Sequence, residues 1–201
     1  MGLFDRFTDL FGDTDEPERA PDPEDLLALS GAALTLEASV GYEPTGDAAL
    51  CFSEPGDDAF ELTIDDLRGV LAATETETGA EFAFDEDDHG YRWVVLTDDT
   101  VESLASSLQF AASTFVEHEY ERHLLATVIA FERDDTDAYL IYSFDRGTFY
   151  PFVPDSTTDR ERDTPTEFRL RSVLDGELPI EPDESQWFPL WPDRPRNRPW
   201  E

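Results

Sequence analysis

With 201 residues, of which 39% are hydrophobic and 12% aromatic, the chain can bury one sizeable core or at most two small ones. Its formal net charge of −34 argues against a nucleic-acid-binding protein, because no basic face is present to neutralise phosphates. All 14 basic residues are arginine, and the acidic residues are spread along the whole chain. We interpret this acidity as halophilic adaptation, since molar salt shortens the Debye length to about 3 Å and screens self-repulsion. The alternative is an acidic surface for a basic partner.

The first twelve residues, MGLFDRFTDLFG, form an amphipathic stripe if they are helical. At 100° per residue its apolar side chains fall within an arc of roughly 120°, and they are Leu3, Phe4, Phe7, Leu10 and Phe11. From the residues alone, this stripe is buried on its own domain, on a partner or at a membrane surface. The acidic residues 13–23 contain three prolines, which predicts a linker.

The next segments predict alternating hairpins and helices. A short helix is expected at EDLLALSGAA, and LTLEASVGYEPTGDAALCFS is expected to form two strands around a turn at Pro44–Gly46. FELTIDDLRGVLAATETETG has helical spacing and ends at Gly79, with one face made of Phe60, Ile64, Leu67 and Leu71. A second hairpin is predicted at AEFAFDEDDHGYRWVVLTD, turning at DEDDHG.

The second half continues this pattern. DTVESLASSLQFAASTFVEHEYER predicts a helix with Asp99 as its N-cap and Glu102 as the capping-box partner. A third hairpin is expected at LLATVIAFERDDTDAYLIYSF, turning at Asp134–Asp137, and TEFRLRSVL alternates like an edge strand.

The element order predicts an α+β fold with a mainly antiparallel sheet, built from successive hairpins, and helices packed on one face. We divide the chain into an amphipathic N-terminal segment (1–12), an acidic proline-rich linker (13–23), a single α+β domain (24–182) and a C-terminal tail rich in tryptophan and proline (183–201).

Motifs of catalysis, cofactor binding or metal binding are missing from the sequence. HEYERH places His118 and His123 five residues apart, whereas a zinc helix needs a spacing of four. DEDDHG places His89 at the third ligand position of a calcium loop, and the apolar neighbours of Cys51 indicate a buried thiol. We therefore expect no enzyme, no cofactor and no metal, with an unrecognised hydrolase as the reserve hypothesis.

Two aromatic stretches carry more information, RGTFYPFVP and SQWFPLWP. Their rings either close one end of the core or serve as docking anchors for a partner. The residues concerned are Arg146, Phe149, Tyr150, Phe152, Trp187 and Trp191.

Five segments along the chain resemble the PspA-associated protein family PspAB, and together they cover nearly its whole length. In chain order, these segments are MGLFDRFTDLFG, EDLLALSGAALTLE, YRWVVLTD, DRGTFYPFVP and DGELPIEPDESQWFPLW. The resemblance implies a role in the phage-shock, or envelope-stress, response, with a PspA-like partner and an association with an HtpX-type membrane protease. It supplies no catalytic residues to carry over.

The N-terminus lacks the basic start and continuous apolar stretch of a secretory signal, and LLATVIAF is too short to span a bilayer. We therefore expect a cytoplasmic accessory protein, peripheral at the inner face of the membrane, whose N-terminal stripe contacts a partner or lipid. The alternative is a chaperone-like module that holds an extended client in an apolar groove lined by Tyr139, Ile141 and Phe149.

Overall fold

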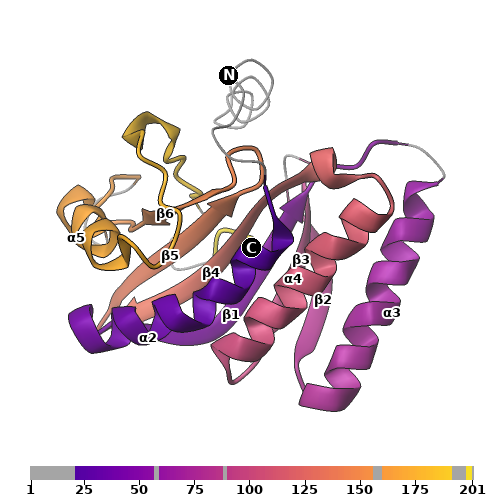
Figure 1. Ribbon diagram of the computed structural model, residues 1–201, viewed down its shortest axis with the longest axis horizontal. Helices are drawn as coiled ribbons and strands as arrows, with labels where there is room; N and C mark the ends of the chain where they lie inside the picture. The colour runs from indigo at the N-terminus through magenta and orange to yellow at the C-terminus, as the bar shows by residue number, and fades with distance from the viewer. Residues whose placement is uncertain (1–20, 57–58, 88–89, 156–159, 192–197, 201) are drawn as a thin grey trace.

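The computed structural model describes residues 21–56, 59–87, 90–155, 160–191 and 198–200. Within these residues, four α-helices and three short 3-10 helices accompany one six-stranded antiparallel sheet of order β2-β3-β1-β4-β5-β6. In Figure 1, α2, α4 and α3 lie side by side in front of the sheet. The predicted α+β fold is thus confirmed. The elements in chain order are η1 (Pro23–Ala28), α2 (Leu29–Val40), β1 (Glu43–Phe52), α3 (Phe60–Thr78), β2 (Glu81–Glu86), β3 (Arg92–Thr97), α4 (Val101–Glu117), η2 (Glu121–His123), β4 (Leu124–Arg133), β5 (Thr136–Ser143), β6 (Thr148–Phe152), α5 (Thr164–Leu174) and η3 (Glu184–Gln186).

The central strands are apolar on both faces. On β5, Leu140 and Tyr142 pack in the cluster beneath the helices, whereas Tyr139 and Ile141 belong to the cluster on the opposite face. This alternation follows from the two-residue period of a strand. Because both faces are covered, β4 and β5 read in the sequence as nearly continuous apolar runs.

Two predicted strands are helices in the structure. LTLEASV lies in α2, and TEFRLRSVL lies in α5. The buried residues of α2 recur with helical spacing, and Leu34, the first residue of the predicted strand, is exposed. The first hairpin prediction was therefore wrong, because β1 pairs with β3 and β4 and has no strand preceding it in the described part of the chain.

The helices α3 and α4 lie where the sequence predicted them. The predicted apolar face of α3 is buried, and Gly79 ends this helix with a left-handed φ of 82°. The N-cap of α4 is Thr100 and not Asp99, since the Thr100 side chain accepts a hydrogen bond from the Ser103 backbone at 3.2 Å. The capping-box pairing with Glu102 was wrong for the same reason.

The face of the sheet opposite the helices is covered by the end of the chain. We call residues 178–191 and 198–200 the C-terminal strap. Three of its buried side chains belong to the cluster that contains Trp93, Tyr139 and Phe152 of the sheet, and they are Trp187, Leu190 and Trp200. The strap supplies on this face the apolar cover that the helices supply on the other.

Candidate functional site

The first aromatic stretch lies at one edge of the sheet. Phe149, Tyr150 and Phe152 belong to β6, where Pro151 is tolerated because β6 is the last strand in the sheet order. Phe149 faces the helices, whereas Tyr150 and Phe152 face the C-terminal strap. All three are at most 2% exposed, so they lie in the core and not on an open docking surface.

The second aromatic stretch joins this same edge. The backbone of Phe149 donates to the Pro179 carbonyl at 2.8 Å, and the backbone of Glu181 donates to the Phe149 carbonyl at 2.8 Å. These bonds make residues 179–181 a short parallel addition to β6. An exposed sheet edge invites pairing with other chains, and here the chain's own strap occupies it.

A buried ion pair fixes this junction. The Arg146 Nε lies 3.1 Å from Glu181 Oε2, and the Glu181 side chain is only 2% exposed. Glu181 also accepts from the Thr148 hydroxyl at 2.9 Å and from the Asp183 backbone at 3.0 Å. The hydrogen bond to Glu181 raises the pKa of Arg146. With these partners, Arg146 positions the strap within the chain.

A second buried carboxylate ties the strap to α5. Glu167 accepts from Arg162 Nε at 2.9 Å and from the Val153 backbone at 2.9 Å. Arg162 also donates to the Trp187 carbonyl. The Arg162–Glu167 pair therefore connects α5, the exit of β6 and the strap. The Trp187 ring is buried, and its Nε1 donates to the Glu181 carbonyl at 3.0 Å.

The remaining rings of the strap complete this packing. Trp191 is partly exposed and meets Phe152 edge-on, with ring centroids 4.9 Å apart. Tyr150 is fully buried, and burial raises the pKa of its hydroxyl. The two stretches that carry the aromatic signal thus form one structural unit.

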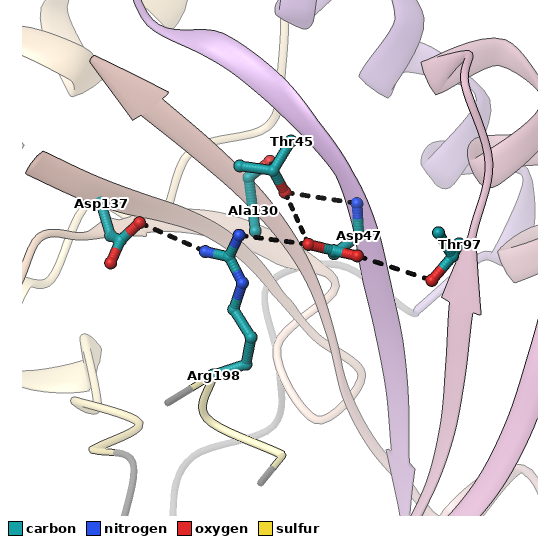
Figure 2. Close-up of polar contacts among 6 residues, drawn as sticks. All are labelled: Thr45, Asp47, Thr97, Ala130, Asp137 and Arg198. Atoms are coloured by element: carbon teal, nitrogen blue, oxygen red, sulfur yellow. Dashed lines mark hydrogen bonds and ion pairs between the residues drawn. The ribbon is translucent and has the colours of Figure 1, made fainter. Parts of the chain in front are cut away.

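The far end of the strap is held by a polar cluster (Figure 2). Arg198 lies 3.1 Å from Asp47 and 3.2 Å from Asp137, and Asp47 also accepts from Thr97 at 3.5 Å. Asp47 sits where the register between β1 and β4 shifts, so this irregularity presents its carboxylate to Arg198. The cluster pins the strap across β1 and β5.

The described residues contain no group of three or more His, Cys, Asp or Glu side chains arranged to hold a metal ion. The two histidines of HEYERH diverge, since His118 lies 2.9 Å from Asp66 and His123 lies 3.1 Å from Ser53. His89 lies outside the described residues. Cys51 is buried, and burial raises the pKa of its thiol well above the usual value, which opposes formation of the nucleophilic thiolate.

A hollow beneath α2 and α5 is lined almost entirely by apolar side chains. Among its lining side chains, only the tyrosines carry a polar group. These residues therefore provide no convergent acid, base or nucleophile. The lining residues are Leu36, Tyr42, Phe131, Ala138, Tyr139, Leu140, Pro151, Leu170 and Leu174.

The structure reveals one surface that the sequence interpretation missed. In a chain with about one acidic residue in four, Ser103–Val116 of α4 and Leu26–Leu36 of η1 and α2 carry no charge. These helices are neighbours in the layer in front of the sheet (Figure 1). We call the outward side of these residues the uncharged helix surface, and its large exposed side chains are Leu27, Leu34, Phe110 and Val116. The Glu177 carboxylate borders it on α2, where it accepts from the Thr35 hydroxyl at 2.8 Å. The sequence signal that could have revealed this surface is Ser103–Val116, a run of fourteen residues without an acidic side chain.

This surface is apolar enough to favour a contact. Leu34 is 68% exposed and Phe110 is 50% exposed. The neighbouring α3 also exposes one large apolar side chain, Leu62, but this side chain lies among Glu61, Asp65 and Asp66. Large apolar side chains exposed on adjacent helices make this surface a candidate interaction surface.

The sequence predicted two contact regions, the N-terminal stripe and an apolar client groove. The N-terminal stripe of Leu3, Phe4, Phe7, Leu10 and Phe11 lies outside the described residues. Tyr139, Ile141 and Phe149 lie within them, but all are at most 2% exposed and they face two different sides of the sheet. They therefore do not line an exposed client groove.

The described helices include none that is long and apolar enough to cross a membrane. Among known proteins, the model of one family, PspAB (PspA associated protein B), matches residues 1–200. No curated protein and no solved structure matches the chain.

Proposed function

The chain belongs to the PspAB family of PspA-associated proteins, and from this membership we propose that it is a non-enzymatic accessory protein that binds a PspA-type protein in the membrane stress response. The observation that carries the proposal is the match of the family model over residues 1–200, which is almost the whole chain. Association with PspA is what the family's name states. We propose in addition that the contact with the PspA-type protein is direct and that it serves the stress response.

The arrangement of polar groups supports a binding role over a catalytic one. The two buried carboxylates, Glu167 and Glu181, are each held by an arginine and by backbone donors. Carboxylates neutralised in this way stabilise a fold and do not offer a free base to a substrate. Among the described residues, four of the six large exposed apolar side chains lie on the uncharged helix surface, and the other two are Leu62 and Phe168.

Three finer parts of the proposal rest on the family resemblance and on composition. The protein acts with an HtpX-type membrane protease, it works in the cytoplasm at the inner face of the membrane, and its host is halophilic. In molar salt the Debye length is about 3 Å, so the net charge of −34 does not prevent contact with anionic lipid or an acidic partner. The N-terminal stripe is the segment proposed to make that contact.

The test is affinity capture from host cells in molar KCl, with the full chain as bait. We expect a PspA-type protein to be enriched relative to an unrelated acidic bait of similar charge. A full chain with Phe4→Asp and Phe7→Asp should capture less of it, because two charges interrupt the apolar stripe. Thr8→Asp adds a charge outside the stripe and serves as the matched control. Capture that lacks any PspA-type protein would contradict the proposed function.

A further inference from the structure

We propose that the outer edge of β2 binds an extended segment of another protein and adds it to the sheet as a further strand. The segment that fits this edge alternates basic and apolar side chains. The inference does not depend on the proposed function, because it uses neither the N-terminal stripe nor the uncharged helix surface. Recognition by strand addition combines backbone hydrogen bonds with contacts of alternate side chains.

The two edges of the sheet differ. At one end of the sheet order, β6 is covered by residues 179–181 of the C-terminal strap. At the other end, on the side of the sheet where α3 lies (Figure 1), β2 pairs within the described residues with β3 only. Proteins commonly protect an edge strand with a proline or a β-bulge. β2 contains no proline, and its register with β3 is unbroken from Glu81 to Glu86.

The hydrogen-bond pattern shows which backbone groups of β2 point outward. The backbone of Asp87 donates to the Tyr91 carbonyl at 3.0 Å, which makes these two residues a hydrogen-bonded pair at the hairpin end. In an antiparallel ladder, hydrogen-bonded and non-hydrogen-bonded pairs alternate. The odd-numbered residues of β2 therefore bond to β3. The even-numbered residues, Phe82, Phe84 and Glu86, direct their N–H and C=O groups away from it.

A local hydrogen bond agrees with this pattern. The backbone of Glu86 donates to the Asp85 side chain at 2.8 Å, so this N–H does not bond to β3 and is already satisfied. The backbone groups of Phe82 and Phe84 meet no second strand in the described part of the chain. These two residues therefore offer two donors and two acceptors to an added strand.

The side of this edge that faces the helices is apolar. Phe82 and Phe84 are partly buried against the cluster beneath the helices, and their rings meet edge-on with centroids 6.2 Å apart. The Arg68 guanidinium of α3 lies 4.8 Å from the centre of the Phe84 ring. A basic side chain on this side of an added strand would be repelled by Arg68, whereas an apolar side chain would extend the row of phenylalanines.

The opposite side of this edge is acidic. Glu81, Ala83 and Asp85 are exposed there. Neither carboxylate forms an ion pair with a described residue. Side chains directly opposite one another on neighbouring strands lie about 4.5–5.5 Å apart at Cβ and interact. Basic side chains at alternate positions of an added strand would therefore pair with these two acids.

A second copy of this chain does not fit the edge. Antiparallel self-pairing centred on Ala83 would place Glu81 of one copy opposite Asp85 of the other. Centred on Phe84, it would place Glu81 opposite Asp87. Like charges directly opposite one another destabilise a strand pair. The acids that oppose self-association favour a basic segment, so the edge fits a different protein.

The first experiment measures amide hydrogen exchange in the full chain. Molar KCl is used because it screens general attraction to the net charge of −34. The probe is the blocked hexapeptide acetyl-RVRVRV-amide, and acetyl-RRRVVV-amide is the control with the same composition but no alternation. In the free protein, Phe82 and Phe84 should be at least about tenfold less protected than Ala83 and Asp85. The alternating probe should slow exchange at Phe82 and Phe84 at least about tenfold, and the control should not.

Several results of this experiment would overturn the proposal. If Phe82 and Phe84 exchange as slowly as Ala83 and Asp85 in the free protein, the edge is already covered. If their protection grows with protein concentration, a second copy occupies the edge. If both peptides protect equally, the attraction is to net charge. If neither peptide protects, the edge does not accept a basic strand.

N-methylated probes test the strand geometry without altering the protein. One version is methylated at the valine amides and the other at the arginine amides, so each removes the donors from one edge of the peptide strand. One version should bind like the parent probe, and the other should bind at least about tenfold more weakly. Equal effects of the two versions would overturn strand addition.

Charge-neutral variants test the acidic side of the edge. Glu81→Gln with Asp85→Asn should weaken binding of the alternating probe at least about fivefold, because two opposed carboxylates are lost. Asp134→Asn with Asp135→Asn is the matched control. It removes two exposed acids at the turn between β4 and β5 and should leave binding unchanged. Circular dichroism checks that both variants fold. Equal weakening by both would assign the binding to net charge and overturn the proposal.

Discussion

The Arg146 guanidinium and the Glu181 carboxylate meet at 3.1 Å although they lie 35 positions apart in the chain. Arg146 precedes β6, and Glu181 is the last of the three residues, 179–181, that pair with this strand. Their contact makes one unit from the two aromatic stretches that stand out in the sequence.

Glu181→Gln should lower the free energy of unfolding by about 2–3 kcal/mol, because three donors converge on this carboxylate and an amide cannot accept from all of them. Urea unfolding in molar KCl measures the change. Asp65→Asn is the control, since the exposed pair of Asp65 with Arg68 should contribute less than about 1 kcal/mol. Equal effects of the two substitutions would contradict a structural role for the pair.

Arg198→Met should destabilise the protein by about 1–2 kcal/mol, because it leaves Asp47 and Asp137 without their shared cation. The strap end with Trp200 should detach first, which acrylamide quenching of tryptophan fluorescence would detect. A double-mutant cycle with Asp47→Asn separates this pair from general damage. Strict additivity of the two substitutions would show that the pair in Figure 2 contributes nothing.

Gly46→Ala should cost more stability than Gly79→Ala, although both glycines have a left-handed φ, of 86° and 82°. At Gly79 an added Cβ meets nothing within 4 Å, so only the backbone strain of about 1–2 kcal/mol applies. At Gly46 the Cβ would lie 2.9 Å from the Asp98 carbonyl oxygen, which adds at least about 1 kcal/mol. Thermal unfolding of both variants side by side gives the difference, and equal melting temperatures would refute the close approach.

Stability should fall as the pH rises above about 10, where tyrosines ionise in the unfolded chain. Burial raises the pKa of Tyr150, so the native state keeps this proton while the unfolded state loses it. With one more proton bound in the native state, the free energy of unfolding falls by about 1.4 kcal/mol per pH unit. Tyr150→Phe should reduce this slope, measured by urea unfolding between neutral and alkaline pH. An unchanged slope would mean that Tyr150 ionises freely in the folded protein.

Thr100→Ala should cost about 1 kcal/mol, because the Thr100 hydroxyl caps the Ser103 backbone amide at the start of α4. Asp99→Ala should stay within about 0.5 kcal/mol of the native protein, as expected for an exposed residue next to the cap. Chemical unfolding of the two variants tests the position of the cap. The opposite order of effects would restore Asp99 as the N-cap.

The sequence by itself determined the elements whose burial follows a simple period. The buried side of α3 repeats every three or four residues, and β4 and β5 are apolar on both faces, so α3 and the third hairpin were predictable. The same signals predicted an antiparallel sheet with helices on one face.

The sequence predicted a helix at EDLLALSGAA, where η1 and the start of α2 lie, but only the tertiary structure decided the rest of α2 and α5. In α5 the buried positions are Glu167, Leu170 and Leu174, and the first of these reads as an exposed residue until Arg162 is placed beside it. In α2 the exposed Leu34 imitates strand alternation, since local spacing cannot tell an unpartnered leucine from a buried one.

The same limit applies to the candidate interaction surface. The acid-free runs in α2 and α4 are visible in the sequence, but their alignment into one surface depends on how the helices pack. The partners of Arg146 and Arg198 were equally invisible, because contacts 35 and 151 positions apart leave no local pattern. Periodicity reports which side of an element is buried, whereas packing alone determines which elements meet.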